Sequence, residues 1–364
     1  MQNKTYFKTP EVVRRVLHSA RPRICDDVAL WCRTNGLSVI ELHQPIHAEI
    51  VPLVRDDAVS GSEIEKHLPD LKRPQSLVVL PRARVRDEIG FVFLPDGAVL
   101  YQGNWFRPYL TDHPGYQARF RSRRSVKGDI FSLLGLWSDS FYHWFHDTLP
   151  RLWNSLPHLP PQTRFLIHSK PFPYQLESLA ALGISQERLE YQQPRGDTVI
   201  ERLWFATPLG HSSFTAGDTL KEIAGAFKKQ FGCETRSPSR RLYISRRKAR
   251  ARAVLNESKL EPLLRKYHFE IVVMEGMSFQ KQVEMCASAG VLIGPHGAGL
   301  TNLLYCPPGS RIGEIGFTGV FPHYLTMTRQ LGHSFFRLIV DKAGEALIIN
   351  ADEFESWLET NFPV

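Results

Sequence analysis

The part of the sequence that most restricts the fold runs from about residue 240 to residue 340. There, short apolar runs alternate with segments of helical periodicity. This alternation is typical of βαβ units, whose strands form a parallel sheet, so we predict a Rossmann-like half. Strands are predicted at 241–245, 269–274, 291–294, 311–315 and 335–340. Helices are predicted at 256–267, 278–289 and 324–331.

The first half of the chain has a less regular pattern. Strand-like runs occur at 38–42, 77–80, 91–94, 130–134, 165–168 and 203–206. Helical patterns occur at 141–152 and 174–182. Together they favour a second α/β domain with β-rich additions before residue 125.

A chain of 364 residues exceeds what one hydrophobic core comfortably supports, so two domains are predicted. The polar segment 232–239 is the best linker candidate. We therefore expect an N-terminal domain at 1–232 and a C-terminal domain at 240–345. Residues 346–364 are predicted to contain a helix that packs back on the N-terminal domain.

The charge and cysteine content restrict the class of protein. A formal net charge of +8 indicates an anionic partner, either nucleic acid, an acidic membrane face or a phosphorylated substrate. No apolar stretch approaches the roughly 20 residues of a membrane span, and the N-terminus has no signal-peptide core, so a soluble cytoplasmic protein is predicted. The five scattered cysteines contain no Cys-x-x-Cys, so neither a disulfide framework nor a zinc site is indicated.

A glycine-rich turn at 294–302 joins a predicted buried strand to a predicted helix. Gly297, Ala298 and Gly299 are bare or nearly bare, so a phosphate can approach the main chain where helix N–H groups are free. His296 adds a donor, and Asn302 is a further polar candidate. The alternative is a turn that exists only for tight packing.

Two other predicted strands carry candidate ligands. Ser245 and Arg246 end the first predicted strand of this half, where an arginine can hold a phosphate with two hydrogen bonds. Alternatively, the arginines at 246–252 form a solvated loop or a nucleic-acid patch. Glu314 lies within an apolar strand and needs a partner, either a ribose or an arginine.

The predicted helix at 141–152 carries His143 and Asp147 four residues apart. This spacing places both side chains on one face, so the carboxylate can orient the imidazole or act beside it. A buried structural hydrogen bond is the alternative. His146 is interpreted as a polar surface residue.

No Asp-x-Asp occurs in the chain. Enzymes that use a divalent metal with sugar nucleotides commonly present such paired carboxylates. Its absence favours neutralisation of a leaving diphosphate by Arg246, His296 and the helix N-terminus, without a metal.

Together these segments resemble glycosyltransferase family 61, whose bacterial members are described as capsular polysaccharide biosynthesis proteins. The resemblance covers roughly residues 130–320. It rests on Phe-Tyr-His-Trp-Phe-His-Asp-Thr-Leu-Pro-Arg-Leu at 141–152, Tyr-Ile-Ser-Arg at 243–246, Met-Ser-Phe-Gln-Lys-Gln at 277–282, Gly-Pro-His-Gly-Ala-Gly-Leu-Thr-Asn at 294–302 and Gly-Glu-Ile at 313–315.

The resemblance implies a GT-B fold, with two facing Rossmann-like domains and a central cleft. It implies an inverting transfer from a nucleotide-sugar donor, with no cofactor and no obligatory metal. Arg246 and the turn at 296–299 would hold the diphosphate, while Ser278 and Glu314 would contact the nucleoside. Because single displacement needs a base for the acceptor hydroxyl, Asp147 or His143 is the candidate.

The expected acceptor is a glycan or lipid-linked glycan, used in bacterial surface polysaccharide synthesis. The basic surface would favour peripheral contact with the anionic inner membrane. Residues 1–125 carry no recognisable motif and are expected to hold acceptor specificity.

Two alternatives to a glycosyltransferase stay open. One is an epimerase or hydrolase with the same fold, and the other is a basic protein that binds nucleic acid or anionic glycan through the arginines at 119–124 and 240–252. No nucleic-acid motif supports the latter.

Overall fold

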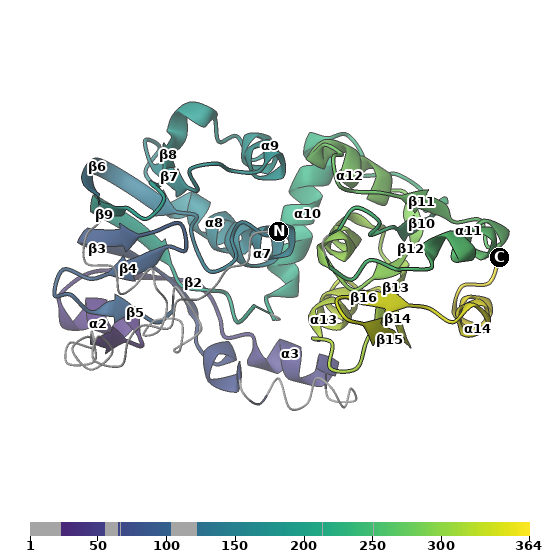
Figure 1. The fold of residues 1–364 in the computed structure, drawn as a ribbon. Helices are drawn as coiled ribbons and strands as arrows, with labels where there is room; N and C mark the ends of the chain where they lie inside the picture. Colours follow the sequence, from purple (N-terminus) through teal and green to yellow (C-terminus); the bar gives the residue numbers. More distant parts are fainter. Residues whose placement is uncertain (1–22, 55–64, 66, 103–121, 213, 250) are drawn as a thin grey trace, which may run out of the picture.

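The computed structural model describes residues 23–54, 65, 67–102, 122–212, 214–249 and 251–364. Two sheets with their covering helices dominate these residues (Figure 1). The first sheet is built from the chain before residue 207 and the second from the chain after residue 239. The predicted α/β class is confirmed. None of the helices in the described ranges combines the length and apolar character that a membrane crossing requires.

The first sheet is mixed, and nine strands belong to it within the described residues. They are β1 (Ile24–Cys25), β2 (Val39–His43), β3 (Gln75–Arg86), β4 (Phe91–Phe93), β5 (Val99–Leu100), β6 (Arg123–Ser132), β7 (Arg164–Ile167), β8 (Leu189–Tyr191) and β9 (Asp197–Ala206). The order is β1-β5-β4-β3-β9-β6-β7-β8, with β2 on β3. β9 runs parallel to β6 but antiparallel to β3, so it joins a parallel part to an antiparallel part.

Besides the helical residues 67–71, the helices described in this half are α2 (Val28–Thr34), α3 (His47–Val54), α7 (Phe141–His143), the π-helix η1 (Trp144–Thr148), α8 (Leu149–Ser155), the short 3₁₀ helices η2 (Leu156–His158) and η3 (Gln186–Arg188), α9 (Pro173–Ala181) and α10 (Gly217–Gln230). The predicted strands are present, several of them extended at one or both ends. The short strands β1, β5 and β8 were not predicted, because two or three residues carry too little periodicity to detect.

The second sheet is entirely parallel and has the order β11-β10-β12-β13-β14. Its strands are β10 (Arg240–Ile244), β11 (Glu270–Val272), β12 (Ala289–Pro295), β13 (Arg311–Gly316) and β14 (Ser334–Ile339). Its helices are α11 (Glu257–Lys266), α12 (Phe279–Cys286), the 3₁₀ helix η4 (Ala298–Tyr305) and α13 (His323–Gln330). The predicted parallel βαβ half is confirmed. The strand order changes direction between β10 and β12, and ligands bind at the carboxyl ends of strands at such a point.

The chain ends in a hairpin, β15 (Asp341–Ala343) and β16 (Ala346–Ile348), followed by helix α14 (Ala351–Asn361). The hydrophobic cluster around α14 includes residues of β10, β12 and β13 in the second sheet. The rings of Trp357 and Phe362 fit against Gly313, where a Cβ would approach them to 2.7 and 2.9 Å. The prediction that this helix packs on the N-terminal half is therefore wrong, because bare Gly313 provides its binding surface on β13.

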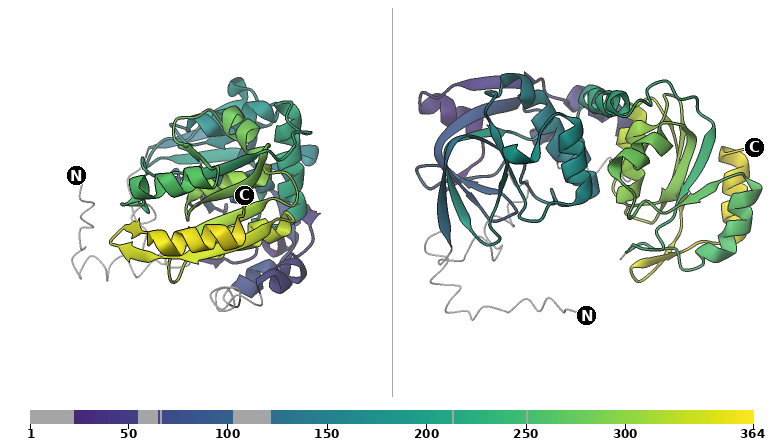
Figure 2. Two further views of the ribbon diagram at one scale, coloured as in Figure 1. Left: turned by 90° about the vertical axis from the view of Figure 1, so that its right-hand side faces the viewer. Right: turned by 90° about the horizontal axis from the view of Figure 1, so that it is seen from above.

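A single hydrophobic cluster runs from the first sheet to the second. Phe145 of η1 stacks on Phe279 of α12 with ring centroids 4.8 Å apart, and Phe227 of α10 meets Phe279 edge-on at 4.9 Å. Seen from above, α10 is viewed nearly along its axis and lies at one side, between the two halves (Figure 2). Helix α10 is therefore the central packing element between the halves.

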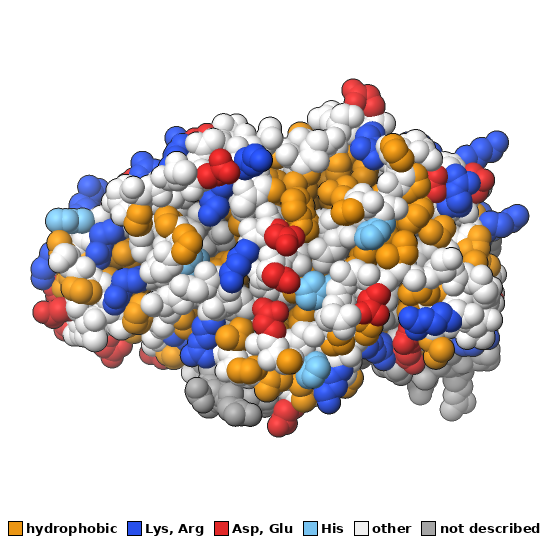
Figure 3. Space-filling model, turned by 180° about the vertical axis from the view of Figure 1, so that it is seen from behind, with side chains coloured by type: hydrophobic (Ala, Val, Ile, Leu, Met, Phe, Trp, Pro, Cys, Tyr) orange, Lys and Arg blue, Asp and Glu red, His pale blue; other side chains and the backbone are white. Residues whose placement is uncertain are grey.

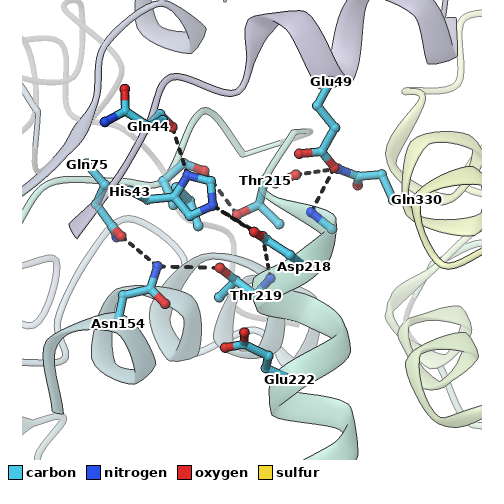
Figure 4. Close-up of polar contacts among 12 residues, drawn as sticks. His43, Gln44, Glu49, Gln75, Asn154, Thr215, Asp218, Thr219, Glu222 and Gln330 are labelled. Atoms are coloured by element: carbon cyan, nitrogen blue, oxygen red, sulfur yellow. Dashed lines mark hydrogen bonds and ion pairs between the residues drawn. The ribbon is translucent and has the colours of Figure 1, made fainter. Parts of the chain in front are cut away.

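A polar cluster fixes the amino end of α10 (Figure 4). Glu49 of α3 accepts hydrogen bonds from Gly217 N at 2.9 Å and from Gln330 Nε2 of α13 at 2.7 Å. Gln330 also donates to Thr215 O. The Glu49 carboxylate lies where a helix N-terminus favours negative charge. These contacts tie α13 to the first half of the chain.

Burial lowers the pKa of His333 to about 4, against an opposing hydrogen bond to Leu303 O, and Lys228 lowers it further. In the unfolded chain the His333 ring takes up a proton near pH 6.5, whereas in the folded protein it stays neutral until about pH 4. We therefore expect stability to fall as the pH drops from about 6.5 towards 4, by up to about 1.4 kcal/mol per pH unit from this side chain. Urea unfolding of His333→Gln between pH 7.5 and 5 should show a shallower dependence than wild type. An unchanged slope would contradict the assignment.

Candidate active site

The predicted anion ligands meet at the carboxyl ends of β10 and β12. Arg246 follows β10, and His296 and Gly297 follow β12. A Cβ at Gly297 would overlap Nη1 of Arg246, so the guanidinium lies directly against this bare backbone position. The φ of Gly297 is 163°, which is extended backbone, so the close approach of Arg246 is what requires glycine here.

Arg246 is half-buried and forms no ion pair with a carboxylate of the described residues, although Glu275 exerts a weaker electrostatic effect on it. Its Nε and Nη2 donate to Ala251 O at 3.3 and 2.8 Å, whereas Nη1 has no hydrogen bond to any described residue. Burial lowers the pKa of Arg246, and the neighbouring Arg252 lowers it further. An unneutralised guanidinium with a free N–H edge is suited to bind a phosphate.

The two residues on either side of Arg246 have other partners. Ser245 is fully buried, and its Oγ donates to Glu257 at 2.7 Å. Arg247 forms ion pairs with Glu257 at 3.1 Å and with Glu261 at 3.0 Å. The candidate ligand Ser245 thus supports the loop from inside, and Arg246 is the residue of this motif that faces the turn.

His296 is held by a hydrogen bond to a buried carboxylate. Its Nδ1 lies 2.5 Å from Oε1 of Glu314, and the other carboxylate oxygen of Glu314 accepts from Arg337 Nε at 2.8 Å. Glu314 is fully buried, with both oxygens engaged. The structure therefore gives Glu314 the salt-bridge role that the sequence left open and not a free face for a ribose. The Nε2 of His296 is left for a ligand.

The partner of Glu314 was missed at the sequence level. Arg337 stands opposite Glu314 in the register of β13 and β14. Both strands were predicted, so the presence of an arginine on the strand after Glu314 was the available signal. Only the register between the strands shows that the two residues meet.

Ser278 and Asn302 have local structural contacts. Ser278 is the N-cap of α12, and its Oγ accepts from Lys281 N at 3.2 Å. Asn302 is buried and donates to Gln282 Oε1 and to Gly299 O, both at 3.0 Å. Asn302 thereby braces the turn, while Gly299 packs on Ile244. Ala298 begins η4, so the N–H groups of its first turn have no partner inside the helix.

The His143 and Asp147 pair lies on the π-helix η1 and the short helix before it. One oxygen of Asp147 lies 2.7 Å from His143 Nδ1, and the other lies 2.9 Å from His146 Nδ1. His146 is 1% exposed, so its interpretation as a surface residue is wrong. The π turn closes with a bond from Leu149 N to Trp144 O, and such turns occur frequently at functional sites.

The carboxylate of Asp147 is fixed between two imidazoles. Burial alone would raise its pKa, but the hydrogen bonds from His143 and His146 outweigh burial and lower the pKa to about 2. The ionised carboxylate accepts from Nδ1–H of each ring. The neutral His143 ring therefore carries its lone pair on Nε2, and its side chain is 16% exposed.

Aromatic contacts connect the two groups of residues. Tyr142 stacks between His146 and His323, with both centroid distances 4.7 Å, and His323 stacks on His296 at 5.9 Å. Tyr324 donates to Gly297 O at 2.7 Å. Stacked rings thus connect the pair on η1 to the turn after β12.

Sequence reasoning missed Tyr142, His323 and Tyr324, although 141–152 and 324–331 were predicted as helices. Burial lowers the pKa of His323 well below its usual value, so this ring stays neutral in the stack. In the described part of the chain, no three His, Cys, Asp or Glu residues are grouped to hold a metal ion.

The fold and the site define a class: an α/β protein in which an arginine and a histidine at a strand-order switch point lie near a His–Asp pair. Residues 141–313, which contain all of these groups, match the model of the family described as Glycosyltransferase 61. Over these residues the chain is similar to glycosyltransferase family 61.

Two curated proteins are similar over shorter segments. The EGF domain-specific O-linked N-acetylglucosamine transferase of Drosophila melanogaster is 41% identical over 76 residues, which are 20% of this chain and 14% of that protein. The protein O-linked-mannose beta-1,4-N-acetylglucosaminyltransferase 2 of Takifugu rubripes is 30% identical over 115 residues, which are 31% of this chain and 20% of that protein. The matched segments span a fifth or less of these relatives.

Proposed function

We propose that this protein transfers a sugar from a nucleotide-sugar donor to a glycan or lipid-linked glycan acceptor. The observation that carries the proposal is the unneutralised Arg246 guanidinium against Gly297, beside His296 and connected to the His143–Asp147 pair through stacked rings. The family match and the names of the two relatives support the same reaction class.

On the donor side, the diphosphate is proposed to bind Nη1 of Arg246, Nε2 of His296 and the N–H groups at the start of η4. As the sugar–phosphate bond breaks, negative charge builds up on the leaving diphosphate, and donors fixed in advance stabilise it. We therefore propose a reaction without an obligatory metal. The buried pair with Glu314 orients His296 for this role.

On the acceptor side, His143 is proposed as the base and Asp147 as its positioning residue. Both oxygens of Asp147 accept hydrogen bonds, and its pKa of about 2 makes it a poor proton acceptor at neutral pH. The Nε2 of His143 has the free lone pair. It takes the proton of the acceptor hydroxyl as this oxygen attacks the anomeric carbon from the face opposite the diphosphate, which inverts the anomeric configuration.

The wider setting is also a proposal. We propose a GT-B arrangement in which the first half binds the acceptor and the second half binds the donor, with domain boundaries near 232 and 240. We also propose a role in bacterial surface polysaccharide synthesis in the cytoplasm. The net charge of +8 supports only the proposed contact with the anionic inner membrane.

Nucleoside diphosphates test the proposal directly. A thermal-shift series with UDP, GDP, CDP, ADP and dTDP, each with and without EDTA, is expected to give stabilisation by one nucleotide that chelation leaves unchanged, because ligands that bind only the folded state raise its stability. The matching nucleotide sugars are then incubated with mixed acceptor glycans. A strict metal requirement contradicts metal independence, and no stabilisation by any nucleotide contradicts the donor site.

The alternative of an epimerase or hydrolase is separated by product analysis. Free sugar or an isomerised nucleotide sugar, formed without any acceptor, would favour the epimerase or hydrolase.

A nucleic-acid-binding protein is less consistent with the distribution of charged side chains on the visible surface. On the face drawn in Figure 3, Lys and Arg side chains are scattered and acidic side chains gather along the middle. Of the arginine runs named above, residues 119–121 and 250 lie outside the described residues.

A further inference from the structure

Trp137 combines strain and exposure next to the proposed base. It lies in the turn between β6 and α7, has a φ of 60° and is 42% exposed. A bulky side chain rarely adopts this left-handed conformation. Such a conformation persists only where the surroundings impose it, and these positions gather at functional sites.

The surroundings of Trp137 do impose its conformation. On the backbone, Ser140 N donates to Trp137 O at 2.8 Å. The neighbouring Ser138 bonds through its Oγ to His168 Nε2 at 2.9 Å, and its carbonyl accepts from Gln175 Nε2 at 2.9 Å. Tyr174 OH donates to Asp139 O at 2.7 Å. The end of β7 and helix α9 thus hold the turn, while the indole itself remains in contact with solvent.

The exposed indole lies beside the proposed base. Its ring centroid is 5.1 Å from that of His143, with 35° between the planes. An acceptor hydroxyl must come within about 3 Å of His143 Nε2 for proton transfer. With the two ring centroids 5.1 Å apart, a sugar ring bound at His143 is within reach of the indole. Pyranose rings have a face of C–H groups, and C–H groups pack favourably on aromatic faces.

We propose that Trp137 is the stacking platform for the pyranose of the acceptor that carries the attacking hydroxyl. This inference rests on the proposed function and adds a binding residue to its acceptor side. Trp137 belongs to the same half as His143, whereas Arg246 and His296 belong to the other half. The platform therefore serves the acceptor and not the donor.

Trp137→Gly is the decisive variant, because it removes the ring and glycine adopts a positive φ without strain. Trp137→Phe keeps an aromatic face. Tyr191→Ala is the matched control, since Tyr191 is 41% exposed on the edge strand β8 and no ring contact joins it to His143 in the described residues. Binding is measured on the full chain by saturation-transfer NMR with the methyl glycosides of glucose, galactose, mannose and N-acetylglucosamine, together with the nucleoside diphosphate found above.

The expected result is saturation of ring C–H protons of at least one glycoside in wild type, Trp137→Phe and Tyr191→Ala, and its loss in Trp137→Gly. The nucleotide signal and the melting temperature of Trp137→Gly should be at least those of wild type. Retained glycoside saturation in Trp137→Gly, or no saturation in wild type, overturns the platform. Glycoside binding that depends on Trp137 in a protein that binds no nucleotide upholds the platform and instead contradicts the proposed transfer reaction.

Discussion

Replacing His143 with alanine is expected to lower kcat by about 10²–10⁴, because general base catalysis contributes a factor of this size. Donor binding should be nearly unchanged, since His143 does not contact the turn at Gly297. Asp147→Asn should lower kcat in the same direction, because an amide cannot accept hydrogen bonds at both positions and one imidazole loses its orientation. Initial rates are measured with the accepted donor and acceptor at saturation.

The control for this prediction is His158→Ala, since His158 lies exposed at the end of η2 in the same half of the chain. Its kcat should equal that of wild type. If His143→Ala retains full turnover, then His143 is not the base. If Asp147→Asn retains it, the carboxylate does not position the ring.

The second large effect is expected from Gly297→Ala. The added methyl group occupies the position of Arg246 Nη1, so the guanidinium must leave the turn. A hydrogen bond to a charged group contributes about 1.5–3 kcal/mol, so we expect nucleoside diphosphate binding to weaken by about 10- to 100-fold. Arg246→Ala should weaken it similarly. Isothermal titration calorimetry gives the affinity directly.

Lys248→Gln is the matched control for the loss of positive charge. Lys248 is exposed two residues after Arg246 on the same loop, so this variant removes the same charge without touching the turn. We expect its affinity for the diphosphate to stay within about twofold of wild type, because exposed charges are strongly screened by salt. Wild-type affinity in Gly297→Ala would show that the guanidinium does not act from this position.

The closeness of Arg246 and His296 could be predicted from sequence. In a parallel sheet, every strand presents its carboxyl end to the same edge, so Arg246 and His296 had to lie close together once both strands were recognised. No such rule predicts contacts between segments that are far apart in sequence. The stacking of His323 between Tyr142 and His296 depends on how α13 and η1 pack, which local periodicity does not encode.

Two other predictions from the sequence differ from the structure, and each difference has a physical reason. The ribose contact expected for Glu314 was displaced by Arg337, whose position depends on the register between β13 and β14. The C-terminal helix was assigned to the wrong half because its apolar face fits either sheet equally well as a pattern. In the structure Trp357 packs against bare Gly313 of β13 and belongs to the same hydrophobic cluster as Tyr243 and Ile293.

The π turn at Trp144–Thr148 has a consequence for how this region can change. A π turn contains one residue more than an α-helix needs, and one residue corresponds to about 100° of rotation around a helix axis. Deleting a residue there would turn either His143 or the buried Leu152 away from its present neighbours. The length of this segment is therefore under a constraint as strict as that on its side chains. A related sequence that lacks one residue of this π turn would place the residues before or after the gap in different surroundings.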